Sequence, residues 1–230
     1  MSHPNTATTP DDVQGRVLTP PTDRRDQSMP PAIAIRFASA AGMIGLACGV
    51  LSNVIERLVD SVIWYYAWHG VLPWGVATVA IGLAVARPLR LAAAAGLVTQ
   101  IGLLVGYYWA DLVRFGEVAW WVAAVYAAVA LFMGPLYGVV GALLTTPATR
   151  RHPVVIGPIS AAFLMDGFNQ MWEADESRRS AGVMVAVGTP YFVLGIVVLC
   201  WLSSSWRDAV AAIRISAPLT GMFVFSVWVY

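Results

Sequence analysis

Charged side chains in this chain fall into widely separated clusters, and the stretches between them are as long as a lipid bilayer is thick. A helix rises about 1.5 Å per residue, so about 20 apolar residues cross the ~30 Å hydrocarbon core. Six stretches contain no Asp, Glu, Lys or Arg: 38–55, 61–86, 91–110, 118–149, 180–206 and 215–230. A seventh, mostly apolar stretch covers residues 154–172. The sequence therefore predicts an all-α, polytopic transmembrane bundle of about seven spans.

Proline interrupts two of these predicted spans near their centres. A proline inside a helix removes one backbone hydrogen bond and collides with the preceding turn. We therefore expect kinked helices at Gly134-Pro135 and at Thr189-Pro190. The interval 118–149 is also too long for one straight span, which adds to the case for a bend there.

Composition divides the chain into two parts. With 58% hydrophobic and 12% charged residues, it has no room for a separate soluble domain of ordinary composition. Residues 1–30 are rich in Pro, Thr and Asp and cannot bury a core. We predict a disordered cytoplasmic tail at 1–30 and a transmembrane domain at 31–230.

Charge constrains both the partners and the orientation. The formal net charge of +1 excludes a basic surface for nucleic acid. All 14 basic residues are arginines, which is typical of a GC-rich bacterial genome. If the N-terminus is cytoplasmic, ten arginines fall inside and four outside, as the positive-inside rule requires. The predicted location is a bacterial plasma membrane, crossed several times, with the N-terminus in the cytoplasm.

Small residues recur at helical spacing and predict close contacts between helices. Glycine and alanine four residues apart form one face on which another backbone can approach. The positions expected at such contacts are Ala41, Gly45, Gly49, Gly102, Gly106, Gly134 and Gly138.

Two polar stripes repeat the spacing i, i+3, i+7 at helix ends that the predicted topology places outside. They are Asn53, Glu56 and Asp60 in one helix, and Asp166, Asn169 and Glu173 in another. Asp166 lies deepest in its span. An intramembrane carboxylate is costly and by default indicates function. The candidate ligand-binding residues are these six together with Gln100 and Tyr107.

The chemistry of these residues leaves several uses open. Carboxylates beside aromatic rings suit an organic cation, hard oxygen ligands suit a divalent metal, and a buried Asp166 suits proton coupling. A purely structural use is also open, because Asp166 and Gln100 can pair with neighbouring helices. The main hypothesis is a small-molecule or cation binding or transport component with an outward-facing acidic and aromatic site.

The alternative hypothesis is a structural or assembly subunit that docks another membrane subunit through its small-residue faces and binds no ligand. Apart from such a subunit, the expected partner is the lipid bilayer. We do not expect an enzyme, because no nucleophile with a base in reach and no metal-binding spacing is visible. No cofactor or metal site is predicted.

Short motifs spread over residues 38–172 support the membrane assignment. They are Pro73-Trp74, Ala86-Arg87-Pro88, Gly106-Tyr107-Tyr108 and Gly134-Pro135-Leu136-Tyr137-Gly138-Val139-Val140-Gly141, followed by an acid in the next helix. In these motifs the chain resembles a family of small actinobacterial multi-spanning membrane proteins that is classed as a domain of unknown function. The resemblance implies a membrane fold and a bacterial origin, and it implies no reaction or ligand.

Overall fold

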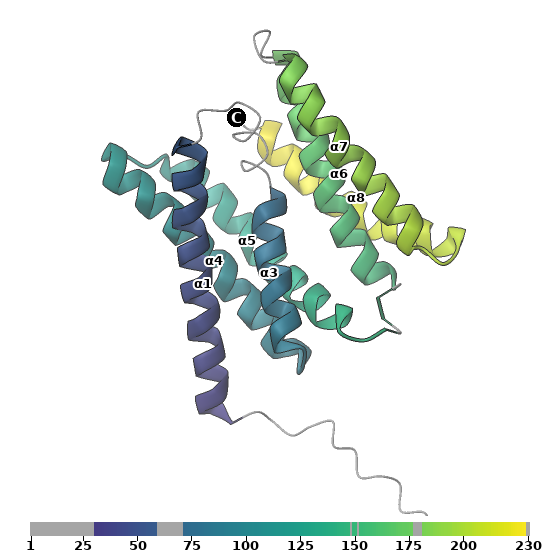
Figure 1. Ribbon diagram of the computed structural model, residues 1–230, viewed down its shortest axis with the longest axis horizontal. Helices are drawn as coiled ribbons and strands as arrows, with labels where there is room; N and C mark the ends of the chain where they lie inside the picture. The colour runs from purple at the N-terminus through teal and green to yellow at the C-terminus, as the bar shows by residue number, and fades with distance from the viewer. Residues whose placement is uncertain (1–29, 59–70, 148, 151, 177–180, 229–230) are drawn as a thin grey trace, which may run out of the picture.

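The computed structural model describes residues 30–58, 71–147, 149–150, 152–176 and 181–228, and no strand occurs among them. The helices are α1 (Pro31–Leu58), α3 (Val71–Val85), α4 (Leu89–Phe115), α5 (Trp120–Leu144), α6 (Pro153–Glu176), α7 (Ala181–Leu202) and α8 (Trp206–Trp228). Figure 1 shows them as one helical bundle. The predicted all-α fold is confirmed. The predicted tail at 1–30 and the stretch 59–70 lie outside the described residues, apart from Pro30.

Several helices are suited to a membrane. Four spans in the described chain are long and apolar enough to cross one: Pro31–Glu56, Leu89–Phe115, Trp120–Leu144 and Val185–Leu202. Helix α3 is also apolar, but its 15 residues reach only about 22 Å. The protein is therefore membrane-embedded, with α3 as a shorter apolar element.

Consecutive helices run in alternating directions (Figure 1). The start of α1 and the α3–α4, α5–α6 and α7–α8 connections lie on one side, which we call the near side. The end of α1 and the α4–α5 connection lie on the opposite, far side. Six arginines belong to the near side by their position in the chain: Arg36, Arg87, Arg90, Arg150, Arg207 and Arg214. The predicted topology also groups these arginines on one side, and the cytoplasmic location of that side stays a prediction.

Helix ends follow local chemistry. Gly116 ends α4 in the left-handed region (φ 74°) and donates its N–H to the Leu112 carbonyl, a conformation that favours glycine. Helix α5 has 25 residues, fewer than the interval 118–149, because a turn begins at Thr145. The Thr145 hydroxyl donates to the Ala142 carbonyl over 2.7 Å and satisfies one terminal acceptor.

Neither internal proline ends its helix. Helix α5 continues through Gly134-Pro135, and α7 continues through Thr189-Pro190. Helices α6 and α8 also contain a proline, Pro158 and Pro218 respectively. Proline is therefore accommodated inside four helices of this bundle.

The helices form two groups that differ in their contacts. Helices α1, α3, α4 and α5 pack on one another and form the first group, whereas α6 packs on α7 and α8 in the second group. Helices α3 and α5 also contact α6 and join the two groups. In Figure 1 the second group, green to yellow, stands beside the purple and teal first group.

Glycine allows the backbones of the first group to approach closely. A Cβ added to Gly45 would collide with the Thr99 carbonyl, and one on Gly49 would collide with the Leu103 carbonyl. Helix α4 presents the reciprocal contact, because Gly102 abuts the Gly42 carbonyl of α1. The same geometry joins α4 to α5 and α3 to α5 at Gly96, Gly134, Gly138, Gly82 and Gly141. Ala41, also on this face, is 2% exposed. The small-residue face of α1 is thus occupied within the chain.

Candidate functional site

Polar side chains of α1 and α4 meet at the far side of the bundle. Asn53 is 1% exposed, and its amide donates to the Asp111 carboxylate over 2.8 Å and to the Tyr107 carbonyl over 3.3 Å. The Tyr107 hydroxyl donates to Glu56 Oε2 over 2.9 Å. We call Asn53, Glu56, Tyr107 and Asp111 the α1–α4 polar cluster.

The spacing of these residues explains why they converge. Asn53 and Glu56 are three residues apart in α1, and Tyr107 and Asp111 are four apart in α4, so each pair shares one helix face. Close backbone packing of α1 on α4 then brings the two faces together. Glu56 is buried at 5% exposed, and Asp111 is half-buried.

Aromatic rings line this cluster. The Trp74 ring of α3 lies 5.6 Å from the Tyr107 ring, and Tyr108 meets Tyr107 edge-on at 5.4 Å. Tyr126 of α5 extends the row, 6.4 Å from Trp74. The Trp74 indole N–H donates to the Ser52 hydroxyl over 3.4 Å, which joins α3 to α1. Four helices therefore contribute to one acidic and aromatic region.

Gln100 joins α3 to α4 about two turns below Tyr107. Its amide donates to the Thr78 hydroxyl over 2.8 Å and to the Trp74 carbonyl over 3.2 Å. The Thr78 hydroxyl itself donates to the Trp74 carbonyl over 3.0 Å. Gln100 is 5% exposed and Thr78 is 0% exposed, so these bonds are shielded from water. The structure thus places Gln100 as a link between helices.

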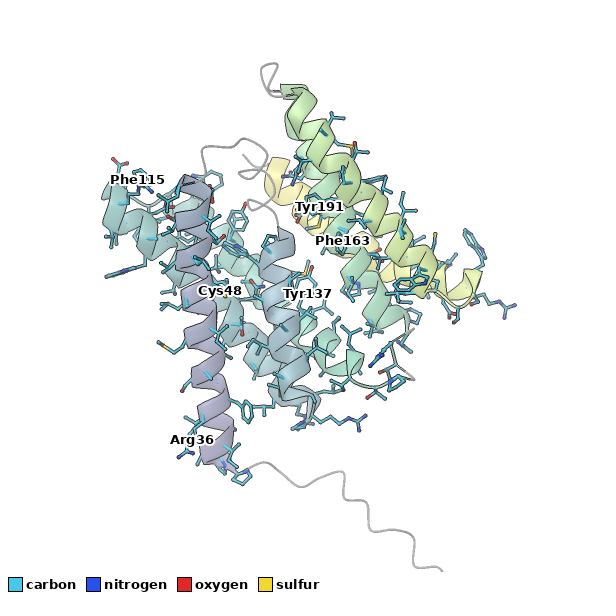
Figure 2. The ribbon with its side chains drawn as sticks, in the orientation of Figure 1. Arg36, Cys48, Phe115, Tyr137, Phe163 and Tyr191 are labelled. Atoms are coloured by element: carbon cyan, nitrogen blue, oxygen red, sulfur yellow. The ribbon has the colours of Figure 1, made fainter. Side chains whose placement is uncertain are left out.

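Asp166 lies in the middle of α6 and is 3% exposed. Ala162, one turn before Asp166, packs with Tyr137 of α5, and Gly167, the next residue, packs against Gly188 of α7. Figure 2 labels Tyr137 in the centre of the structure, and Phe163 and Tyr191 together on the second group. The rings of Phe163 and Tyr191 are 6.5 Å apart. Asn169, one turn further along α6, is half-buried.

The two predicted stripes therefore have different surroundings. Asn53 and Glu56 are hydrogen-bonded to α4, whereas Asp166 belongs to a helix that contacts α5 and α7. Asp60 lies outside the described residues. Glu173 lies within α6, but its side chain is not among those described.

Sequence reasoning did not select Asp111, Trp74, Thr78 or Ser52 for a site. Helical spacing could have identified Asp111, because it follows Tyr107 by one helical turn and so shares its helix face. The other three belong to α3 and α1, and their meeting depends on how α3 packs between its neighbours. Within the described part of the chain, no three His, Cys, Asp or Glu side chains lie close enough to hold a metal ion.

The fold and site define a polytopic helical membrane protein with carboxylates buried between its helices. The chain belongs to a family of unknown function, DUF6518, whose model matches residues 28–230. The match is broader than the 38–172 expected from motifs and extends over α7 and α8. No curated protein and no solved structure shows significant similarity to the chain.

Proposed function

We propose that the protein is a membrane-embedded binding or transport component that takes an organic cation at the α1–α4 polar cluster. The observation that carries this proposal is that two carboxylates, Glu56 of α1 and Asp111 of α4, lie in one cluster of hydrogen-bonded side chains. Glu56 is held by the Tyr107 hydroxyl, and Asp111 is held by the Asn53 amide. The far side of the bundle thus concentrates negative charge.

The donors in these two hydrogen bonds are uncharged. A phenol and an amide position the carboxylate oxygens of Glu56 and Asp111 without adding a positive charge to the cluster. At an interface of low dielectric constant the attraction between a carboxylate and a cation is stronger than in water. The cluster is therefore suited to a positively charged ligand.

Aromatic rings favour an organic cation over a metal ion. A cation over a tyrosine or tryptophan face gains about 0.5–2 kcal/mol, and quaternary ammonium groups use such contacts. Tyr107 and Tyr108 are half-buried, so the row of rings is open in part at its edge. Asp111 is half-buried as well. A ligand has an approach to the cluster from this half-exposed edge.

The packing of the small residues bears on the assembly hypothesis. That hypothesis expected Gly45 and Gly49 to dock a partner, whereas in the structure both lie against α4. A partner subunit would need another surface. Cation binding is therefore the better supported proposal.

Thermal unfolding of the detergent-purified protein tests the proposal, with tetramethylammonium chloride as the probe. Sodium chloride at equal ionic strength corrects for general salt effects. A ligand that binds only the folded state stabilises it by RT ln(1 + [L]/Kd) and so raises the unfolding midpoint. We expect tetramethylammonium to raise the midpoint of the wild type more than sodium does.

The variant Glu56→Gln removes the charge and keeps the side-chain shape. We expect it to weaken the apparent affinity for tetramethylammonium at least tenfold. Glu117→Gln is the matched control, because Glu117 is exposed in the α4–α5 connection. If Glu56→Gln fails to fold, Asp111→Asn replaces it. An undiminished shift of the unfolding midpoint by tetramethylammonium in these variants would refute the proposed site. If binding is observed, uptake of tetramethylammonium into proteoliposomes distinguishes transport from binding alone.

A further inference from the structure

The junction between the two helix groups differs from the packing inside each group. Wherever an added Cβ on a described glycine would meet another atom within 4 Å, the nearest atoms come from a helix of the same group. Within the second group, Gly167 abuts the Gly188 carbonyl of α7, and Gly157 abuts the Ala212 carbonyl of α8. Such backbone contacts give close van der Waals packing that resists sliding. Each group is therefore built as a rigid unit.

Side chains, in contrast, fill the junction. Met133 and Tyr137 of α5 pack with Ala162 of α6 in one buried cluster, and Val79 of α3 borders it. A thioether side chain is flexible and adapts to changed surroundings. Repacking of such side chains allows a change in the relative position of two rigid groups.

Asp166 is at this junction, four residues beyond Ala162 on the same face of α6. Ala162, one turn before it, packs with Tyr137 of the first group, and Gly167, the next residue, packs against Gly188 of α7 in the second group. A carboxylate that is 3% exposed in the middle of a helix of this bundle is costly in its charged form. Addition of a proton gives a neutral carboxyl group that can donate a hydrogen bond as well as accept one.

We propose that Asp166 is a proton-binding site that controls how the second helix group packs against the first. The proton comes from water and binds a carboxylate oxygen, and it returns to water on release. The proposal does not depend on cation binding at the α1–α4 polar cluster.

The helices that contact α6 carry several other titratable side chains. Tyr137 of α5 packs with Ala162 and Tyr191 of α7 lies beside Phe163, so both come from helices that contact α6 near Asp166, and the sequence of α3 contains no titratable side chain. Helix α8 carries Arg207, Asp208 and Arg214, and α8 meets α6 at Gly157, about two and a half turns before Asp166. The remaining titratable side chains of the described parts of α5 and α7 are Tyr126 and Cys200. Tyr126 lies beside Trp74, and Cys200 is exposed.

Infrared difference spectroscopy across a pH titration tests whether Asp166 binds a proton. The wild type should show a component of the carboxyl band that appears as the pH falls and that is absent from Asp166→Asn. Glu117→Gln, which changes an exposed acid, should keep this component. Identical carboxyl bands in the wild type and in Asp166→Asn would overturn the proposal.

Distances between spin labels test whether the proton on Asp166 changes how the two helix groups pack. Labels at Leu131→Cys in α5 and Val197→Cys in α7 report on the two groups, because both positions are exposed. Cys48 and Cys200 are replaced by serine in this background. The distance distribution should shift with pH in the wild type, and Asp166→Asn should keep the low-pH distribution at every pH.

A variant that retains a titratable group keeps the test decisive. Asp166→Glu should retain both the infrared band and the distance shift, with altered midpoints. It also replaces Asp166→Asn if that variant does not fold. A distance distribution that ignores pH in the wild type would overturn the coupling to movement. A shift that is unchanged in Asp166→Asn would do the same.

Discussion

The Tyr107 hydroxyl of α4 donates a hydrogen bond of 2.9 Å to the Glu56 carboxylate of α1. Buried hydrogen bonds to charged groups contribute about 1.5–3 kcal/mol. We therefore expect Tyr107→Phe to lower the free energy of unfolding by about that amount and to weaken tetramethylammonium binding. Denaturant titration in detergent measures the first effect, and the thermal shift measures the second. Trp109→Phe should change neither the free energy of unfolding nor tetramethylammonium binding, because the Trp109 side chain is 61% exposed. A silent Tyr107→Phe would show that the bond is dispensable.

The contact of Gly49 with the Leu103 carbonyl leaves no room for a methyl group. We expect Gly49→Ala to destabilise the bundle by about 1–3 kcal/mol, because α1 must move away from α4. Gly182→Ala is the matched control, since nothing lies within 4 Å of an added Cβ there. At that position alanine should be neutral or stabilising by up to about 1 kcal/mol. Equal melting temperatures for the two variants would contradict the close contact between α1 and α4.

Gln100 connects two helices, whereas the Thr99 hydroxyl donates to Ala95 within α4. An interhelical hydrogen bond in a membrane contributes about 0.6–2 kcal/mol. Gln100→Leu should therefore lower thermal stability measurably, and Thr99→Val should lower it less. Melting curves of both variants, monitored by circular dichroism, provide the comparison. The reverse order would mean that Gln100 does not hold α3 to α4.

The orientation of the bundle is a prediction that accessible cysteines can test. Single cysteines at Pro147, Ser204 and Glu117 are placed in a background without Cys48 and Cys200. The positive-inside rule predicts that a membrane-impermeant maleimide labels the Glu117 position in intact bacterial cells. The Pro147 and Ser204 positions, on the near side, should react only after the membrane is permeabilised. Labelling from the outside at Ser204 but not at Glu117 would reverse the orientation and place the polar cluster in the cytoplasm.

The sequence was sufficient for the helices themselves. Long intervals without charge located them. A charge or an unpaired backbone group in hydrocarbon costs several kcal/mol, so a spanning segment is apolar and helical. Glycine at intervals of four residues likewise indicated which faces approach another backbone. Helical periodicity alone placed Asn53 and Glu56 on a common face. These features depend on residues close together in the chain.

Only the tertiary structure decided which faces meet. The sequence left open whether the stripe of Gly45 and Gly49 served a partner, and the structure places it against α4. It likewise joined Asn53 to Asp111, 58 residues away, and buried Asp166 in a helix that contacts both α5 and α7. The reason is physical, since lipid exposure sets the apolarity and length of a span but does not choose its neighbours. That choice depends on close packing and hydrogen bonds between helices distant in sequence.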